Sequence, residues 1–164
     1  MKKSVAVFLL FLTLFSLASC GGDSVKELQF THEDGFSITL TEAFREDSNT
    51  DYTASYISKD VSVFVLKEPF TKLEGFGDYS LAQYGEMLRA ANDNGTATEL
   101  YAIDDITVFE YSFYNKEENL EYKYFNAIFK GDGAFWCVQF ACLKADYALY
   151  KPDFTEYAKS FMIQ

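Results

Sequence analysis

The segment from Ala134 to Leu143 is apolar on both of its alternating sides, and it constrains the fold more than any other feature of the chain. In an extended strand, Phe135 and Cys137 point to one side. The other side then carries Trp136, Val138 and Phe140. A strand that is apolar on both faces has to be covered on both sides. We therefore expect a central strand with further layers packed above and below it.

Four earlier segments alternate apolar and polar residues in the way that paired strands do. The turn between the first two is Asp34-Gly35, a typical tight-turn sequence, and Lys59-Asp60 joins the next two. Pro69 ends this second pair, because proline cannot donate to a β ladder. The expected strands are 28–32, 36–40, 52–56 and 61–65.

The apolar period changes from two to near 3.6 after a loop at 75–78, which predicts a helix from Tyr79. Asp78 or Ser80 can cap its start, and Asn94-Gly95 can end it. Its expected apolar face consists of Leu81, Tyr84, Met87, Leu88 and Ala91.

A meander and a second helix complete the chain. The expected strands are 99–103, 106–114 and 120–130, with a polar loop at 115–119. Gly131-Asp132-Gly133 then turns into the central strand. The last helix is expected from about Pro152, since proline suits a first helical turn. Its expected apolar face consists of Phe154, Tyr157, Ala158 and Phe161.

This order of elements resembles the Mog1/PsbP-like superfamily over most of 27–163. The run from Asp34 to Phe44 (DGFSITLTEAF) and the pair Ser160-Phe161 carry the resemblance in detail. It implies an α+β fold in which an antiparallel β-sheet is flanked by helices, an α/β/α sandwich. It also implies action by binding other proteins rather than by catalysis. No functional residue is carried over, because no partner-binding motif of the family is present.

The N-terminus resembles the signal peptide of a bacterial lipoprotein. Lys2 and Lys3 precede an apolar run over 5–17, and Leu17-Ala18-Ser19-Cys20 has the form of a lipobox. The run is shorter than the roughly 20 residues that span a bilayer. We expect a signal peptide over 1–19, an acylated Cys20 anchored extracytoplasmically to the bacterial cell membrane, a tether over 20–26 and one domain over 27–164. The alternative is an ordinary secretory signal that leaves Cys20 as a free thiol.

The charge of the chain limits its partners. Cleavage would remove two lysines and no acid, which changes the net charge from −11 to −13. Such a surface disfavours nucleic acid, which calls for basic patches. Anionic lipid headgroups would also repel it, so the lipid on Cys20 would hold the protein on the membrane.

Two further cysteines, Cys137 and Cys142, lie in the proposed central strand. A spacing of five residues places them on opposite faces and about 16 Å apart, too far for a disulfide. No glycine or proline between them could bend the strand. We expect two buried free thiols, although an extracellular setting would otherwise favour oxidation.

No motif in the chain predicts catalysis, a metal site or a cofactor. The single histidine, His32, is expected to be structural, and zinc would need more ligands than the chain offers. The segment 92–95 imitates a calcium loop, but Ala90 and Tyr101 occupy two of the required ligand positions. It is better interpreted as a helix-ending turn. The remaining acidic pairs, Asp104-Asp105 and Glu117-Glu118, could bind calcium weakly, but they are expected to be solvated turns.

The sequence alone is compatible with three functions. The first is a non-enzymatic module that binds or scaffolds an envelope or extracellular protein. The second is a receptor for a small ligand or glycan that uses exposed aromatic rings. The third is a hydrolase that uses paired carboxylates in a cleft. The second depends on whether these rings are exposed: Tyr52, Tyr84, Tyr101, Tyr122, Tyr124 and Trp136.

Overall fold

A computed structural model describes residues 25–49, 51–72 and 74–164. The N-terminal part comprises β1 (Glu27–His32), β2 (Phe36–Thr41), β3 (Arg45–Asp47), β4 (Ala54–Ile57), β5 (Val61–Pro69), the short 3-10 helices η1 (Phe70–Lys72) and η2 (Phe76–Asp78), and α1 (Leu81–Asn92). The C-terminal part comprises β6 (Tyr101–Ile103), β7 (Ile106–Asn115), β8 (Leu120–Lys130), β9 (Ala134–Leu143), η3 (Lys144–Asp146), α2 (Tyr147–Lys159) and β10 (Met162–Ile163).

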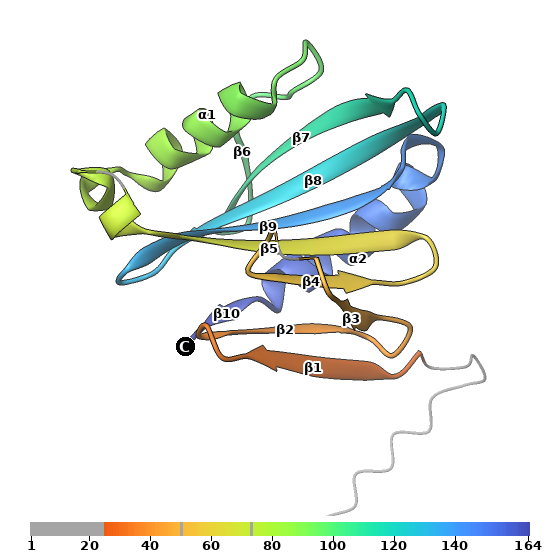
Figure 1. Ribbon diagram of the computed structural model, residues 1–164, viewed down its shortest axis with the longest axis horizontal. Helices are drawn as coiled ribbons and strands as arrows, with labels where there is room; N and C mark the ends of the chain where they lie inside the picture. Colours follow the sequence, from red (N-terminus) through yellow and green to blue (C-terminus); the bar gives the residue numbers. More distant parts are fainter. Residues whose placement is uncertain (1–24, 50, 73) are drawn as a thin grey trace, which may run out of the picture.

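The strands form two antiparallel sheets (Figure 1). Seven of them form one sheet in the order β3-β4-β5-β9-β8-β7-β6, so β9 is the middle strand, as its sequence predicts. The first hairpin is confirmed, but it belongs to a separate small sheet, in the order β1-β2-β10. Strand pairing is therefore between neighbours in sequence, except where β5 pairs with β9 and β2 with β10.

β9 is buried on both faces and separates two hydrophobic clusters. Trp136, Val138 and Phe140 belong to the cluster beneath α2 and the small sheet. Phe135 and Cys137 belong to the cluster beneath α1. Helices therefore flank the large sheet on both sides, and the expected α+β sandwich is confirmed.

The layer of α2 differs in detail from expectation. The helix begins at Tyr147, so Pro152 lies inside it rather than at its start. Tyr147, five residues before the proline, packs against the core. The free energy gained by this packing exceeds the loss of the one helical hydrogen bond that proline cannot make. Phe161 lies just beyond the helix end but still packs on Phe36, with ring centroids 5.4 Å apart.

The layer of α1 begins at a capping box. The Ser80 side chain accepts a hydrogen bond from the Gln83 backbone N–H, and the Gln83 side chain accepts one from the Ser80 backbone N–H. Ser80 is thus the cap, whereas residues 76–78 form η2 instead of the expected loop. Tyr84 stacks on Phe135 at 4.3 Å, but Ala91, expected on the apolar face, is exposed.

Two strands have no signal in the sequence. β3 has three residues and β10 two, too few to show alternation. β10 forms because its backbone pairs with Phe36 and Ser37 of β2, a partner more than 120 residues earlier. β4 and β6 are each two residues shorter at the start than expected. In the described part of the chain, no helix is long and apolar enough to cross a membrane.

Glu110 ties α2 to the large sheet. Its carboxylate lies 2.7 Å from the Lys151 ammonium of α2 and 3.5 Å from that of Lys123 on β8, and it accepts a hydrogen bond from the Tyr101 hydroxyl. Burial alone would raise the pKa of the Glu110 carboxyl, but these partners outweigh it and hold the pKa below its usual value. Glu110 is therefore a buried carboxylate with a structural role.

Cys137 and Cys142 are free and buried, and they belong to different clusters on opposite sides of β9, as their spacing predicts. Burial raises the pKa of the Cys137 thiol to about 12 and that of Cys142 to about 11. Neither thiol is therefore ionised near neutral pH.

We predict that both thiols are unreactive toward a disulfide reagent in the native Cys20→Ser protein and that both react in denaturant. Burial and the raised pKa values suppress the thiolate only while the chain is folded. Counting released thiolate by absorbance before and after adding guanidinium measures this. A count of zero in denaturant would mean that the cysteines are oxidised.

We predict that the Glu110 contacts stabilise the fold above the ordinary pKa of glutamate, about 4.3, and that this contribution disappears as the pH falls through the lower native pKa. Glu110→Gln should cost about 2–3 kcal/mol at pH 7. It should also reduce the loss of stability on going to acid. Denaturant unfolding at both pH values measures the difference, with the exposed Glu117→Gln as the matched control; equal acid sensitivity of both variants would contradict the prediction.

Candidate functional site

An open groove occupies the end of the large sheet that α1 leaves uncovered. It has a volume of about 470 Å³ and lies where β5 and β8 begin and where β7 and β9 end. In Figure 1, this is the end at which the β7–β8 hairpin projects past α1. We name it the aromatic groove, and its floor consists of Ser62, Phe64, Phe113, Leu120, Tyr122, Tyr124, Ala141 and Leu143.

Strand register brings these side chains to one face. Tyr122 pairs with Leu143 on one side and with Phe113 on the other, and Tyr124 pairs with Ala141. Directly paired residues point to the same face of a sheet, and so do alternate residues of one strand. The groove therefore follows from the alternation within β8 together with its two neighbours.

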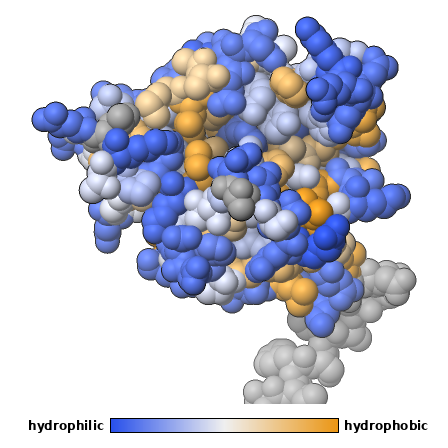
Figure 2. Space-filling model, viewed as in Figure 1, coloured by the Kyte–Doolittle hydropathy of each residue, from blue (hydrophilic) through white to orange (hydrophobic). Residues whose placement is uncertain are grey.

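The rings are held in place by stacking, yet part of their surface is open to solvent. Phe64 stacks with Tyr52 at 4.6 Å, and Tyr124 stacks with Tyr111 at 4.7 Å. Phe113 is 47% exposed. Figure 2 shows the side of the molecule seen in Figure 1 as hydrophobic patches separated by hydrophilic residues. Rigid, half-exposed rings of this kind are typical of binding surfaces.

A buried polar cluster lies between the groove and the core beneath α1. Gln139, the one polar interruption of β9, donates hydrogen bonds to the Tyr111 hydroxyl at 3.0 Å and to Asn126 Oδ1 at 2.8 Å. Burial raises the pKa of the Tyr111 hydroxyl, so it stays protonated. The amide of Gln139 is thus satisfied within the sheet.

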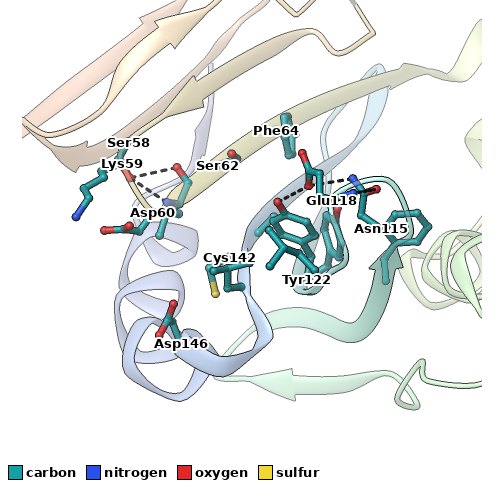
Figure 3. Close-up of a pocket in the computed structure, with 16 residues that line it drawn as sticks. Ser58, Lys59, Asp60, Ser62, Phe64, Asn115, Glu118, Tyr122, Cys142 and Asp146 are labelled. Carbon is teal, nitrogen blue, oxygen red and sulfur yellow. Dashed lines mark hydrogen bonds between the residues drawn. The ribbon is translucent and has the colours of Figure 1, made fainter.

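Carboxylates stand around the groove (Figure 3). Glu118 Oε2 accepts hydrogen bonds from the Tyr122 hydroxyl at 2.7 Å and from Asn115 Nδ2 at 3.0 Å, which orients the group. Asp60 and Asp146 line the other side. Within 25–49, 51–72 and 74–164, no lysine, arginine or histidine forms a salt bridge with these three carboxylates. The groove therefore combines apolar rings with a negative rim.

The aromatic residues singled out from the sequence divide into two groups. Tyr84 and Trp136 are core residues, and Tyr101 donates to Glu110 on the other face. Tyr122 and Tyr124 line the groove, and Tyr52 supports it through Phe64. Sequence reasoning did not find Phe64, Phe113 or Glu118 as site residues, because only the pairing of β5, β9, β8 and β7 brings them together.

The geometry offers little to a hydrolase. Hydrogen bonds from the Gly95 and Ala97 backbone N–H groups lower the pKa of Asp93, and the pKa of Glu110 is also low, whereas a general acid needs a raised value. The Asp93 bonds close the turn that ends α1, and this is the helix-ending turn that the sequence predicts. His32 stands beside Asp34 at its hairpin turn, 3.3 Å away. The described residues contain no cluster of three or more acidic, histidine or cysteine side chains that could hold a metal, and Cys20 lies outside them.

Comparison with known proteins defines the fold. No family model matches the chain, and no curated protein matches its sequence. The solution structure of PsbP (CyanoP) from Synechocystis sp. PCC 6803 matches with a TM-score of 0.57 and 14% identity, covering 90% of this chain and 99% of that one. A structure from Bacteroides thetaiotaomicron VPI-5482 matches with a TM-score of 0.55 and 14% identity over 85% of this chain, which spans only 48% of that one.

A third structure, LpqN of Mycobacterium tuberculosis, is described as involved in cell envelope biogenesis. It matches with a TM-score of 0.46 and 10% identity, covering 87% of this chain and 92% of that one. The match to PsbP shows that this chain has a PsbP-like fold, and the resemblance inferred from the sequence is confirmed at that level.

Proposed function

We propose that this chain is a non-enzymatic, extracytoplasmic module that is anchored to the bacterial cell membrane through a lipid on Cys20 and binds another envelope protein. The observation that carries the proposal is the aromatic groove, an open surface of half-exposed rings at one end of the sheet. Aromatic residues are enriched where proteins meet, and a few of them supply most of the binding free energy.

The groove is built for contact rather than for chemistry. Catalysis requires a nucleophile, a base and a stabilising group in one place. The Ser58 hydroxyl at the rim is tied to its own turn, because it donates to the Val61 carbonyl and accepts from the Val61 N–H, both at 3.1 Å. His32, the one histidine of the chain, is on β1 in the other sheet. These arrangements favour binding over turnover.

The position of β1 supports a partner at the membrane surface. β1 begins at the end of the molecule where the β4–β5 and β7–β8 turns also lie (Figure 1). A seven-residue tether over 20–26 would extend to at most about 25 Å. An anchored domain would therefore hold the groove within reach of proteins embedded in or resting on the membrane.

A glycan receptor is the second candidate. Phe64 and Tyr124 are partly exposed rings that line the groove on one side of the sheet. Flat rings of this kind suit a sugar as well as a peptide. The two candidates differ in their ligand, which is a protein in the first case and a sugar in the second, so crosslinking to a protein and binding of an oligosaccharide distinguish them.

We predict that Cys20→Ser releases the protein from the membrane and leaves the fold unchanged, because two acyl chains hold a protein stably and the acidic surface adds no attraction. Fractionation of cells followed by immunoblotting measures release, and the melting curve of the purified variant measures folding. Persistence in the membrane fraction after cleavage of residues 1–19 would contradict the proposed anchor.

We predict that a photoreactive benzoylphenylalanine at position 113 forms a discrete adduct with one envelope protein in intact cells. Phe113 is exposed at the groove, so a bound partner lies within reach of the probe. The matched control is the same probe at Leu149, which is 72% exposed on α2.

Both adducts are read on immunoblots after irradiation. An adduct at 113 alone supports the proposal. Equal adducts at both positions contradict it. So does the absence of any adduct at 113. If a neutral envelope oligosaccharide then binds saturably, the result favours the glycan receptor.

A further inference from the structure

The cluster around Glu110 shows how this domain satisfies a carboxylate that stands beside a tyrosine. Glu110 accepts from the Tyr101 hydroxyl, and the Lys151 ammonium lies 2.7 Å from the same carboxylate. Lys151 also lies over the Tyr101 ring, 5.7 Å from its centroid. A carboxylate, a tyrosine and a cation thus form one closed unit, in which the cation contacts both the charge and the ring face.

The rim of the aromatic groove contains a similar carboxylate–tyrosine pair, which is exposed to solvent and has no cation among the described residues. Glu118 accepts from the Tyr122 hydroxyl, as Glu110 does from Tyr101. Both hydrogen bonds to this carboxylate end on Oε2, which leaves Oε1 without a partner among the described residues. Among the described residues, Lys59 is the one lysine that lines the groove, and its side chain points away from Glu118 (Figure 3).

The other rings of the groove also carry no cation. Lysines lie over the rings of Trp136, Tyr147 and Phe135 elsewhere in the domain, at 5.0–5.6 Å. In the described part of the chain, none lies over a groove ring. Asp60 and Asp146 add two more carboxylates to the rim.

We infer that the groove binds a basic, extended segment of the partner protein, whose arginine or lysine side chains supply the missing cations. This inference rests on the proposed function and specifies its partner. The groove crosses four strands, β5, β9, β8 and β7, which at about 4.8 Å per strand is about 14 Å, the length of roughly four extended residues. The net charge of −11 would speed the approach of such a segment.

The experiment measures binding of a fluorescein-labelled hexapeptide of alternating arginine and leucine to the full chain carrying Cys20→Ser, by fluorescence anisotropy. The matched probe replaces arginine with citrulline, which keeps the shape and removes the charge. We expect the arginine peptide to bind about tenfold more tightly or better, and its affinity to fall as salt is raised.

Variants place the effect at the groove. Glu118→Gln should weaken the arginine peptide about three- to tenfold, because it removes the charge and keeps an acceptor for Tyr122. Asp146→Asn should also weaken binding of the arginine peptide. Because the Asp146 side chain makes no hydrogen bond that caps α2, this substitution should leave the helix intact. Glu117 is the neighbour of Glu118 in sequence but does not line the groove. Glu117→Gln should therefore change the affinity for the arginine peptide less than about twofold. Melting curves establish that each variant is folded.

Equal affinity for the two peptides, or an affinity that neither Glu118→Gln nor Asp146→Asn changes, overturns the inference. If that result comes with a discrete envelope adduct from position 113, the inference fails while the proposed function stands. If the adduct is missing as well, both fail.

Discussion

The burial of β9 on both faces is the constraint on which the other elements depend. Because Trp136 and Phe135 point in opposite directions from adjacent positions, the sheet needs a layer on each side, and each ring is the centre of a different cluster. α2 and the small sheet satisfy one face, and α1 satisfies the other. The middle strand thus dictates the sandwich, and its neighbours β5 and β8 are placed by direct pairing with it.

The two covers are unequal, and the groove is a consequence. Beneath α1, Tyr84 and Phe76 pack closely on Phe135, aided by Gly85, where an added Cβ would lie 2.5 Å from Ile128. The helix is short and ends at Asn92, so the far end of the same face keeps its rings in contact with solvent. On the other face, the Glu110 cluster fastens α2 to the sheet. This uncovered sheet end with its stacked rings is the surface that we propose for a partner.

Much of the architecture could be predicted because it depends on local periodicity. The alternation over 61–65, the apolar run over 134–143 and the helical period from Leu81 are clear patterns, and the structure has strands and α1 at these positions. The failures have physical causes. Pro152 lies inside α2 because the packing of Tyr147 extends the helix backward, and β10 exists because β2 offers an unpaired edge near the chain end. Such effects have no local signature.

The sequence by itself determined that β9 is central and that its two cysteines lie on opposite faces. These properties depend on residue type and spacing along the chain. Only the tertiary structure decided which aromatic residues are available to a ligand. Tyr84 projects from α1 onto Phe135 and is fully buried, whereas Tyr124 lies on the same face of the sheet at its open end. Phe113 and Phe64 are 49 positions apart, and strand pairing brings them to one groove, because a sheet joins residues by register rather than by sequence distance.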